Sequence, residues 1–332
     1  MPAIPRTILV APDSFKGTLR AGEVAEAIGR GLEEAGRPVE LCPIADGGEG
    51  TLEALLPALG GTLESVSVSD PLGRRIEAGF GLGEPVRGAR VAVVESAVAS
   101  GLGLLHPDEL DPVAASTAGT GELIVAAIRA GAATVYVGVG GSATTDGGSG
   151  AIRAIERGGG LGYARLVVLC DVRTPFEDAA RVFAPQKGAA PRDVARLTRR
   201  LNGMARRLHR DPRGVPMTGA AGGLAGGLWA RFGATLEPGA GFVLDLLDFD
   251  RRMRAAHAVV TGEGRLDEQS LAGKAVSEVA TRARQAGVPC HAIVGRRELD
   301  AFGARILDLQ AILEAGTIAQ LRAAGRELAA LV

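Results

Sequence analysis

The sequence has few aromatic residues, almost no net charge and no long apolar run, and each shortage excludes a class of function. Aromatic residues make up 3% of the 332 residues, and the net charge is −1. Nucleic-acid-binding proteins usually carry a basic surplus and rings that stack on bases, so this class is disfavoured. No apolar run has the length of a membrane span, and residues 1–6 are too short and proline-rich for a signal peptide. We therefore expect neither nucleic acid nor membrane as a partner.

Cysteine and histidine are too sparse for most metal or redox sites. Cys42, Cys170 and Cys290 lie far apart, each in or beside an apolar run, and no CxxC pair occurs. This pattern is typical of buried thiols in a reducing compartment, so we expect a cytoplasmic protein. The four histidines are scattered, which argues against a histidine-based metal site.

Lysine is also scarce, because only three of the 37 basic residues are lysines. Lys16, Lys187 and Lys274 each lie next to a glycine. Lysine is a compact point charge that reaches phosphate groups, and a neighbouring glycine lets the backbone approach a ligand. For any single lysine, chance is as good an explanation as function. The glycine beside all three lysines, however, favours a phosphate-handling enzyme.

The order of apolar patterns predicts an α/β fold. Short apolar runs such as 7–10 and 39–44 alternate with helical patterns such as 23–34, which indicates a mainly parallel sheet covered by helices. A hairpin-like patch over 62–94 interrupts this series. The alternation of strand and helix patterns resumes near the C-terminus. We therefore predict a discontinuous Rossmann-like domain from residues 1–70 and 256–332, with a second α/β domain inserted at 71–255.

Polar residues follow the first two predicted strands, where α/β sheets bind ligands. Asp13, Ser14 and Lys16 follow the first strand, and Asp46 and Glu49 flank two glycines after the second. Two carboxylates at a helix start indicate a metal ion or a substrate hydroxyl that needs a base. Helix capping is the plainer alternative for both motifs.

The stretch 139–148 combines glycines, three hydroxyls and an aspartate between a predicted strand and helix. This composition suits phosphate groups and Mg²⁺. The candidate ligands are Gly140, Gly141, Ser142, Thr144, Asp146 and Gly147. The spacing Gly138-x-Gly140-x-x-Ala143 also matches the dinucleotide fingerprint, but the helix starts late and the expected acid is missing. Binding of NAD(H) would distinguish a dehydrogenase.

Further candidates lie after later strands. In the stretch 260–267, Arg265 lies between Glu263 and Asp267. A solvent-exposed surface alone poorly explains so many charged residues in so short a segment. Asp171 follows an apolar strand as a possible base or a turn residue, and Lys187 lies in a loop that could hold a phosphate. No Walker A motif fits any lysine.

In this order, the motifs resemble those of the bacterial two-domain glycerate kinases. The matching segments are Ala11-Pro-Asp-Ser-Phe-Lys16, Ala45-Asp-Gly-Gly-Glu-Gly50, Thr120-Gly-Glu122, Gly140-Gly-Ser-Ala-Thr-Thr-Asp-Gly-Gly148, Cys170-Asp171, Phe183-Ala-Pro-Gln-Lys-Gly188, Gly219-Ala-Ala-Gly-Gly-Leu224 and Thr261-Gly-Glu-Gly-Arg-Leu-Asp267. They cover nearly the whole chain. The resemblance implies ATP- and Mg²⁺-dependent phosphorylation of D-glycerate, with the 2-hydroxyl favoured. It also implies an active site in the cleft between two α/β domains.

The kinase hypothesis gives each candidate a role. Asp46 and Glu49 would contact the substrate hydroxyl or the metal, with Asp171 and Asp267 as rival bases. Asp13 and Ser14 would contact the substrate, Arg265 would bind the glycerate carboxylate, and residues 140–148 would hold the nucleotide phosphates. Lys16 and Lys187 would neutralise phosphate charge. On this hypothesis Lys16→Arg should reduce turnover most, Lys187→Arg next and Lys274→Arg least.

Two departures from the family pattern support an alternative. The family has a longer segment between the helix after Asp146 and the Cys170-Asp171 strand, whereas residues 156–163 join them almost directly here. The tail after Gly295 also differs. The alternative is an impaired or non-catalytic relative that binds nucleotide or hydroxy acid. Retention of every acidic motif favours the active kinase, and monomer and homodimer both remain open.

Overall fold

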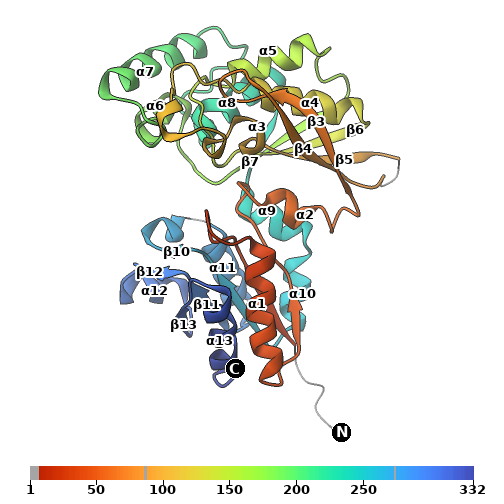
Figure 1. The fold of residues 1–332 in the computed structure, drawn as a ribbon, viewed down its shortest axis with the longest axis vertical. Helices are drawn as coiled ribbons and strands as arrows, with labels where there is room; N and C mark the ends of the chain where they lie inside the picture. Colours follow the sequence, from red (N-terminus) through yellow and green to blue (C-terminus); the bar gives the residue numbers. More distant parts are fainter. Residues whose placement is uncertain (1–6, 86–87, 273) are drawn as a thin grey trace. The chain divides into compact units, whose positions relative to one another are not determined.

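The computed structural model describes residues 7–85, 88–272 and 274–332. It divides into two compact units: unit 1 is Met1–Asp46 with Ala240–Val332, and unit 2 is Gly47–Gly239 (Figure 1). Each unit is a sheet with helices packed on it, so the α/β fold class is confirmed. The boundaries at 46/47 and 239/240 differ from the predicted ones at 70/71 and 255/256.

Unit 1 contains a five-stranded sheet in the order β13-β11-β9-β1-β2, and all its pairings are parallel. The strands are β1 (Ile8–Pro12), β2 (Val39–Leu41), β9 (Ala258–Gly262), β11 (Cys290–Val294) and β13 (Ile312–Glu314). The central strands β1, β9 and β11 are buried along their whole length, which explains their continuous apolar sequences. A small sheet of β10 (Arg265–Leu266) and β12 (Arg296–Arg297) adjoins them in sequence.

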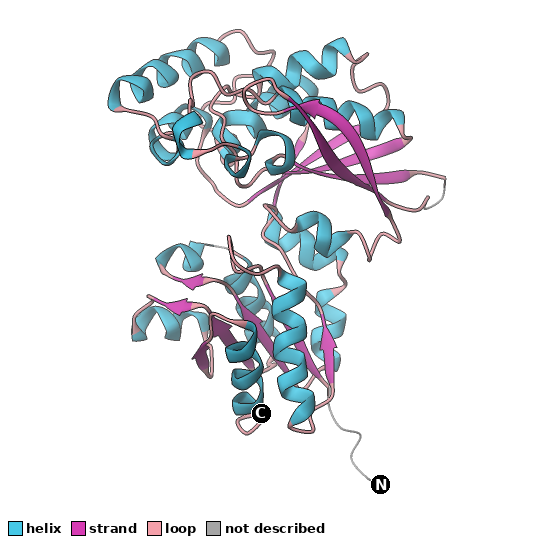
Figure 2. Ribbon diagram, in the orientation of Figure 1, coloured by secondary structure: helices cyan, strands magenta, loops and turns pink. Residues whose placement is uncertain are grey.

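Helices cover both faces of this sheet, as Figure 2 shows. Alternate residues of β1 serve opposite layers: Ile8 and Val10 pack with α1 (Ala21–Glu34) and α13 (Ile318–Leu328). Leu9 and Ala11 belong to the core on the other face. The helices of that second layer are α9 (Gly239–Leu246), α10 (Phe249–Ala255), α11 (Ala275–Ala286) and α12 (Ala301–Leu307).

Two glycines set how closely α1 and α13 approach each other. A Cβ atom added at Gly31 would lie 2.1 Å from the Arg322 carbonyl oxygen, and one at Gly325 would lie 2.5 Å from the Ile28 carbonyl oxygen. Both obstacles are helix backbone, which cannot move aside without separating the helices.

Gly31→Ala is therefore expected to destabilise unit 1 by about 1–3 kcal/mol, the usual cost of overpacking. The matched control is Gly203→Ala in α7 (Pro191–Ala205), where an added Cβ meets nothing within 4 Å. There alanine should stabilise by up to about 1 kcal/mol through its higher helix propensity. Calorimetric unfolding of both variants checks the pair, and equal shifts would show that α1 and α13 are not tightly packed.

Unit 2 contains a six-stranded sheet in the order β3-β4-β5-β6-β7-β8. Its strands are β3 (Thr62–Ser69), β4 (Arg75–Leu82), β5 (Arg90–Glu95), β6 (Ala132–Gly138), β7 (Arg165–Cys170) and β8 (Thr235–Pro238). The first three are antiparallel neighbours, and the last four run parallel. Because β3 pairs along its full length with β4, the hairpin lies whole in unit 2. A domain boundary at residue 70 would separate β3 from β4. The structure therefore places the boundary before this hairpin.

The helices of unit 2 pack on this sheet or on each other. They are α2 (Thr51–Leu55), α3 (Ala97–Ser100), α4 (Ala118–Arg129), α5 (Ser149–Arg157), α6 (Ala179–Phe183), α7 and α8 (Ala220–Phe232). Helices α4, α5 and α8 share the main core with the strands, whereas α6 and α7 form a separate apolar cluster around Phe176. Residues 158–164 connect α5 directly to β7. In the described part of the chain, no helix is both long and apolar enough to span a membrane.

Candidate active site

A polar pocket of about 500 Å³ lies at the C-terminal edge of the parallel sheet in unit 1. Each of four strands contributes to it from the loop that follows: Asp13 comes after β1, Glu263 after β9, Gly295 after β11 and Gly316 after β13. Ligands of open α/β sheets bind at this edge. The pocket therefore lies where the sequence predicted a ligand, and it gathers Asp13, Ser14, Lys16, Arg265 and Asp267 from that prediction.

Lys16 and Asp46 form an ion pair beside this pocket. The Lys16 Nζ atom lies 2.7 Å from Asp46 Oδ2. The Asp46 side chain is 2% exposed and that of Lys16 is 52% exposed, so a buried carboxylate holds a cation that also faces solvent. Lys16 thus keeps access to a charged ligand while it compensates the buried charge.

Asp13 is the most strongly perturbed carboxyl group of unit 1. Its side chain is 4% exposed. Burial raises its pKa well above the ordinary value, and the charge of Asp46 raises it further. Lys16 and the backbone N–H of Ser14, which donates to Asp13 Oδ1 at 2.6 Å, oppose this rise only in part. A carboxylate with a raised pKa is suited to accept a proton near neutral pH.

Glu263 is a second perturbed carboxyl group in the pocket. Burial raises its pKa to about 7, although Ser270 and Lys274 pull in the other direction. Its Oε1 atom is buried without a hydrogen-bond partner among the described residues. Glu263 belongs to a motif that the sequence singles out, but no role for it follows from the sequence alone. The available signal was its place directly after the mostly apolar strand β9.

Arg265 and Asp267 line the same pocket but differ in their hydrogen bonds and ion pairs. The Arg265 side chain is exposed and lies 3.6 Å from Glu298, so its guanidinium group can also reach a ligand. The Asp267 carboxylate accepts a hydrogen bond from the backbone of Gln269 at 2.9 Å. Lys274 lines the pocket and donates to the Gln269 side chain at 3.3 Å. The role of Asp267 as a base stays a prediction.

A second pocket, of about 230 Å³, lies in unit 2 against the loop 139–148. It brings together five sequence candidates: Gly140, Gly141, Ser142, Asp171 and Lys187. Glycine backbone, a hydroxyl and an ammonium group on one small cavity form a suitable site for phosphate oxygens.

Lys187 is buried beneath this loop. Its side chain is 2% exposed, and Nζ donates to Ser142 Oγ at 2.9 Å and to the Thr144 carbonyl oxygen at 2.5 Å. Burial lowers the pKa of Lys187 to about 7, and the charge of Asp146 only partly opposes this. Lys187 therefore holds the loop in shape and carries a charge that a bound anion would stabilise.

Asp146 is occupied by the backbone around it. Its carboxylate accepts hydrogen bonds from the backbone N–H groups of Thr117, Gly148 and Gly150 at 2.9–3.1 Å. These bonds tie the start of α5 to the start of α4. The arrangement is that of a helix cap, and a role of Asp146 toward nucleotide or metal stays a prediction.

Thr144 and Gly147 lie deeper in the loop and do not line this pocket. The Thr144 hydroxyl is buried without a hydrogen-bond partner in the described part of the chain. Gly147 packs against α7, because an added Cβ would lie 2.7 Å from Met204 Sδ. Glu49 lies in unit 2 and is exposed, whereas Asp46 is the last residue of the first segment of unit 1.

A left-handed turn in α8 presses against the same loop. Ala221, Gly222 and Gly223 all have positive φ angles, and Ala221 lines the pocket. A Cβ atom at Gly222 would lie 2.1 Å from the Thr144 carbonyl oxygen. The glycine cluster at 219–223 therefore serves close backbone packing and also borders the ligand space.

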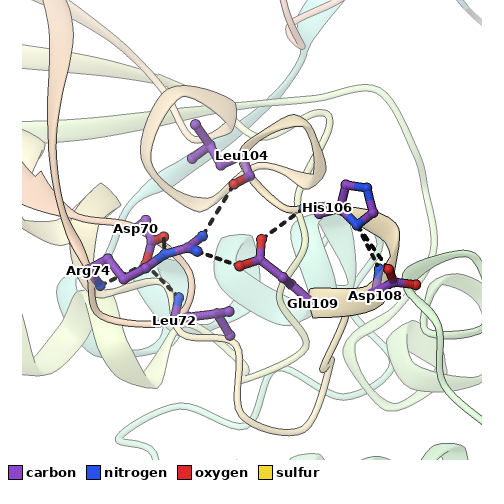
Figure 3. A network of polar contacts seen from close by, with 7 residues as sticks. All are labelled: Asp70, Leu72, Arg74, Leu104, His106, Asp108 and Glu109. Carbon is purple, nitrogen blue, oxygen red and sulfur yellow. Dashed lines mark hydrogen bonds and ion pairs between the residues drawn. The ribbon is translucent and has the colours of Figure 1, made fainter.

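A polar network lies around Arg74 in unit 2 (Figure 3). Arg74 bonds to the buried Asp70 and to Glu109, which ties the β3–β4 turn to residues 102–109. The adjoining backbone then bonds to the loop: Leu102 N–H donates to the Gly141 carbonyl oxygen at 2.9 Å. The network thus fixes the segment against which Gly140 and Gly141 lie.

The described residues contain no group of three or more His, Cys, Asp or Glu side chains arranged to hold a metal ion. Mg²⁺ in phosphoryl-transfer enzymes keeps several waters and phosphate oxygens, so one or two carboxylates suffice. The buried Glu263 Oε1 without a partner, close to other carboxylates, fits such a hard cation.

Comparisons with known proteins give the family of this chain. The sequence profile of the glycerate kinase family matches residues 8–158 and 159–327. The chain belongs to the glycerate kinase family. Membership identifies it as a kinase. The two matched stretches meet in the connection between α5 and β7.

Several members of the family are similar along most of the chain. Glycerate kinase of Halalkalibacterium halodurans is 38% identical, over 87% of this chain and 85% of that protein. Glycerate 2-kinase of Escherichia coli K12 is 36% identical, over 87% and 84%. A crystal structure assigned to glycerate kinase 2 of Salmonella typhimurium LT2 superposes with a TM-score of 0.83 at 34% identity, covering 99% of this chain and 98% of that one.

Proposed function

We propose that this kinase transfers the γ-phosphoryl group of ATP to the 2-hydroxyl of D-glycerate, with Mg²⁺ as cofactor. The observation that carries the proposal is the pocket of unit 1, where Asp13, Lys16 and Asp46 place a high-pKa carboxyl group beside an ion pair. Family membership and the similarity to a protein named glycerate 2-kinase support the substrate and its position.

In this mechanism the carboxylate of Asp13 accepts the proton of the substrate hydroxyl. The hydroxyl oxygen forms the new bond to phosphorus as the bond to the ADP oxygen breaks. Burial and the charge of Asp46 raise the pKa of Asp13 into the range that general-base catalysis near neutral pH requires. Arg265 would pair with the glycerate carboxylate, because its guanidinium group is exposed in the same pocket.

Cations of the chain would neutralise the charge that spreads over the phosphoryl oxygens. Lys16 can supply one positive charge in unit 1, and Lys187 with the glycine loop can bind nucleotide phosphates in unit 2. Glu263 and Asp46 would hold Mg²⁺, which neutralises phosphate charge when it is bound. Glu263 replaces Glu49 in this proposal because its carboxylate lies in the acidic pocket.

The test is phosphorus NMR of the purified protein with ATP, Mg²⁺ and D-glycerate. We expect 2-phosphoglycerate to form with D-glycerate and much less product with L-glycerate. Formation of 3-phosphoglycerate would contradict the proposed position. ATP binding without any phosphoglycerate would overturn the proposal and support a non-catalytic member of the family.

A further inference from the structure

Unit 2 contains a third pocket, which differs in charge from the two described above. Its volume is about 420 Å³, and four arginines line it: Arg153 from α5, Arg200 from α7, Arg207 just after α7 and Arg231 from α8. It shares no lining residue with the pocket of Gly140 and Lys187. No role in the proposed reaction accounts for this convergence of positive charge.

Most of this positive charge has no ion-pair partner among the residues that the structure describes. Arg153 and Arg207 take part in no ion pair among the described residues. Arg231 pairs with Glu156 at 2.6 Å, and Arg200 uses one N–H group on the Val113 carbonyl oxygen. Each guanidinium group has five N–H donors in a planar fork, so many donors remain for an anion.

The one carboxylate in the lining does not reverse this balance. Asp146 is 1% exposed, and its oxygens already accept several backbone hydrogen bonds. The four arginine side chains are exposed to solvent, whereas Asp146 is buried. A ligand would therefore meet guanidinium groups first.

The remaining wall is mostly apolar. Ile152, Met204 and Leu208 line the pocket together with Ser149. The volume lies in the range of small-molecule sites, which combine apolar walls with a few converging polar groups. A bare inorganic anion would leave this apolar surface unused, whereas the carbon skeleton of an organic phosphate would cover it.

We infer that this arginine pocket binds a phosphate-bearing small organic molecule at a site separate from the proposed catalytic pockets. The shared chemistry is a phosphate group held by guanidinium forks, and its source is either a nucleotide or a phosphorylated hydroxy acid. Occupancy would also act on the glycine loop. Asp146 belongs to both the loop and the pocket wall, and Met204 packs against Gly147.

The test is arginine-specific labelling with phenylglyoxal, read residue by residue by mass spectrometry. Separate arms contain inorganic phosphate, ADP and 2-phosphoglycerate. We expect ADP or 2-phosphoglycerate to protect Arg153, Arg200 and Arg207 at concentrations at least tenfold below those of inorganic phosphate. Equal protection by inorganic phosphate, or none by any of the three, would overturn the inference. The readout needs no turnover, so it is independent of whether the chain phosphorylates glycerate.

Substitutions of the pocket arginines test whether the protection arises from binding in this pocket. In Arg153→Gln/Arg207→Gln, the midpoint for protection of Arg200 should rise at least tenfold, while the double lysine variant should keep part of the protection because it keeps the charge. The matched control is Arg192→Gln on α7, whose side chain is 89% exposed and outside the pocket. An unchanged midpoint in the double glutamine variant, or an equal rise in the control, would overturn the site.

Discussion

Asp13→Asn is expected to lower the turnover of ATP with D-glycerate by about 10²- to 10⁴-fold, the usual contribution of a general base. Asparagine keeps the size of the side chain and its hydrogen bond to the Ser14 N–H, but it cannot accept the substrate proton. In the unchanged enzyme, kcat/KM should rise with pH through the raised pKa of Asp13, well above the ordinary range of an aspartate. Rate measurements from pH 5 to 9 check both points.

The same substitution should stabilise the fold, which separates lost chemistry from lost structure. Because the folded pKa of Asp13 lies above its unfolded value, the native state binds more protons between the two values. Its stability then falls as pH rises through that window. Asparagine mimics the protonated form, so the variant should melt at a higher temperature at pH 8. A variant with reduced activity and a lower melting temperature would contradict the role of Asp13.

Lys187→Arg is expected to reduce turnover more than Lys16→Arg, by about tenfold or more. This order reverses the one that the sequence predicts. Lys187 is buried and bonded to Ser142 and Thr144, and the larger planar guanidinium group would displace the loop. The Lys16 side chain is half exposed, so arginine at that position can still pair with Asp46. Steady-state kinetics with varied ATP measure both variants, and equal kinetics would contradict the prediction.

Because burial lowers the pKa of Lys187, we expect the protein to take up protons when nucleotide binds. With a pKa of about 7, most Lys187 side chains are neutral at pH 8, and a phosphate beside them would favour the charged form. Calorimetric titration with ATP in two buffers of different ionisation enthalpy should show this uptake, and Lys187→Met should reduce it. Uptake that persists unchanged in Lys187→Met would assign the proton to another group.

The features that follow from local sequence were predictable. Continuous apolar runs such as Ile8–Pro12 identify buried parallel strands, and the polar residues after them fall at one edge of the sheet. The features that depend on distant packing were not. The burial of Lys187 follows from contacts with residues more than 40 positions away. The link between α4 and α5 depends on Asp146 accepting a hydrogen bond from the backbone of Thr117, 29 residues earlier.

The domain boundary shows the same limit. Residues 62–94 were recognised as hairpin-like, but only the pairing of β3 with β4 and of β5 with β6 assigns them to unit 2. Glu263 was noted without a role, because its lack of a hydrogen-bond partner becomes visible only when its neighbours are placed around it.

The pairing of β1 with β9 has a consequence for how the protein is made. Thr261 Oγ1 bonds to the Ala11 carbonyl oxygen across 250 residues of sequence, and β1 lies between β9 and β2. During synthesis at about 5–20 residues per second, β1 therefore leaves the ribosome many seconds before its partner exists. Unit 2 is continuous and can fold first, while an apolar strand waits with one edge open. Nascent chains of this protein are therefore expected to depend on chaperones until the last hundred residues have emerged.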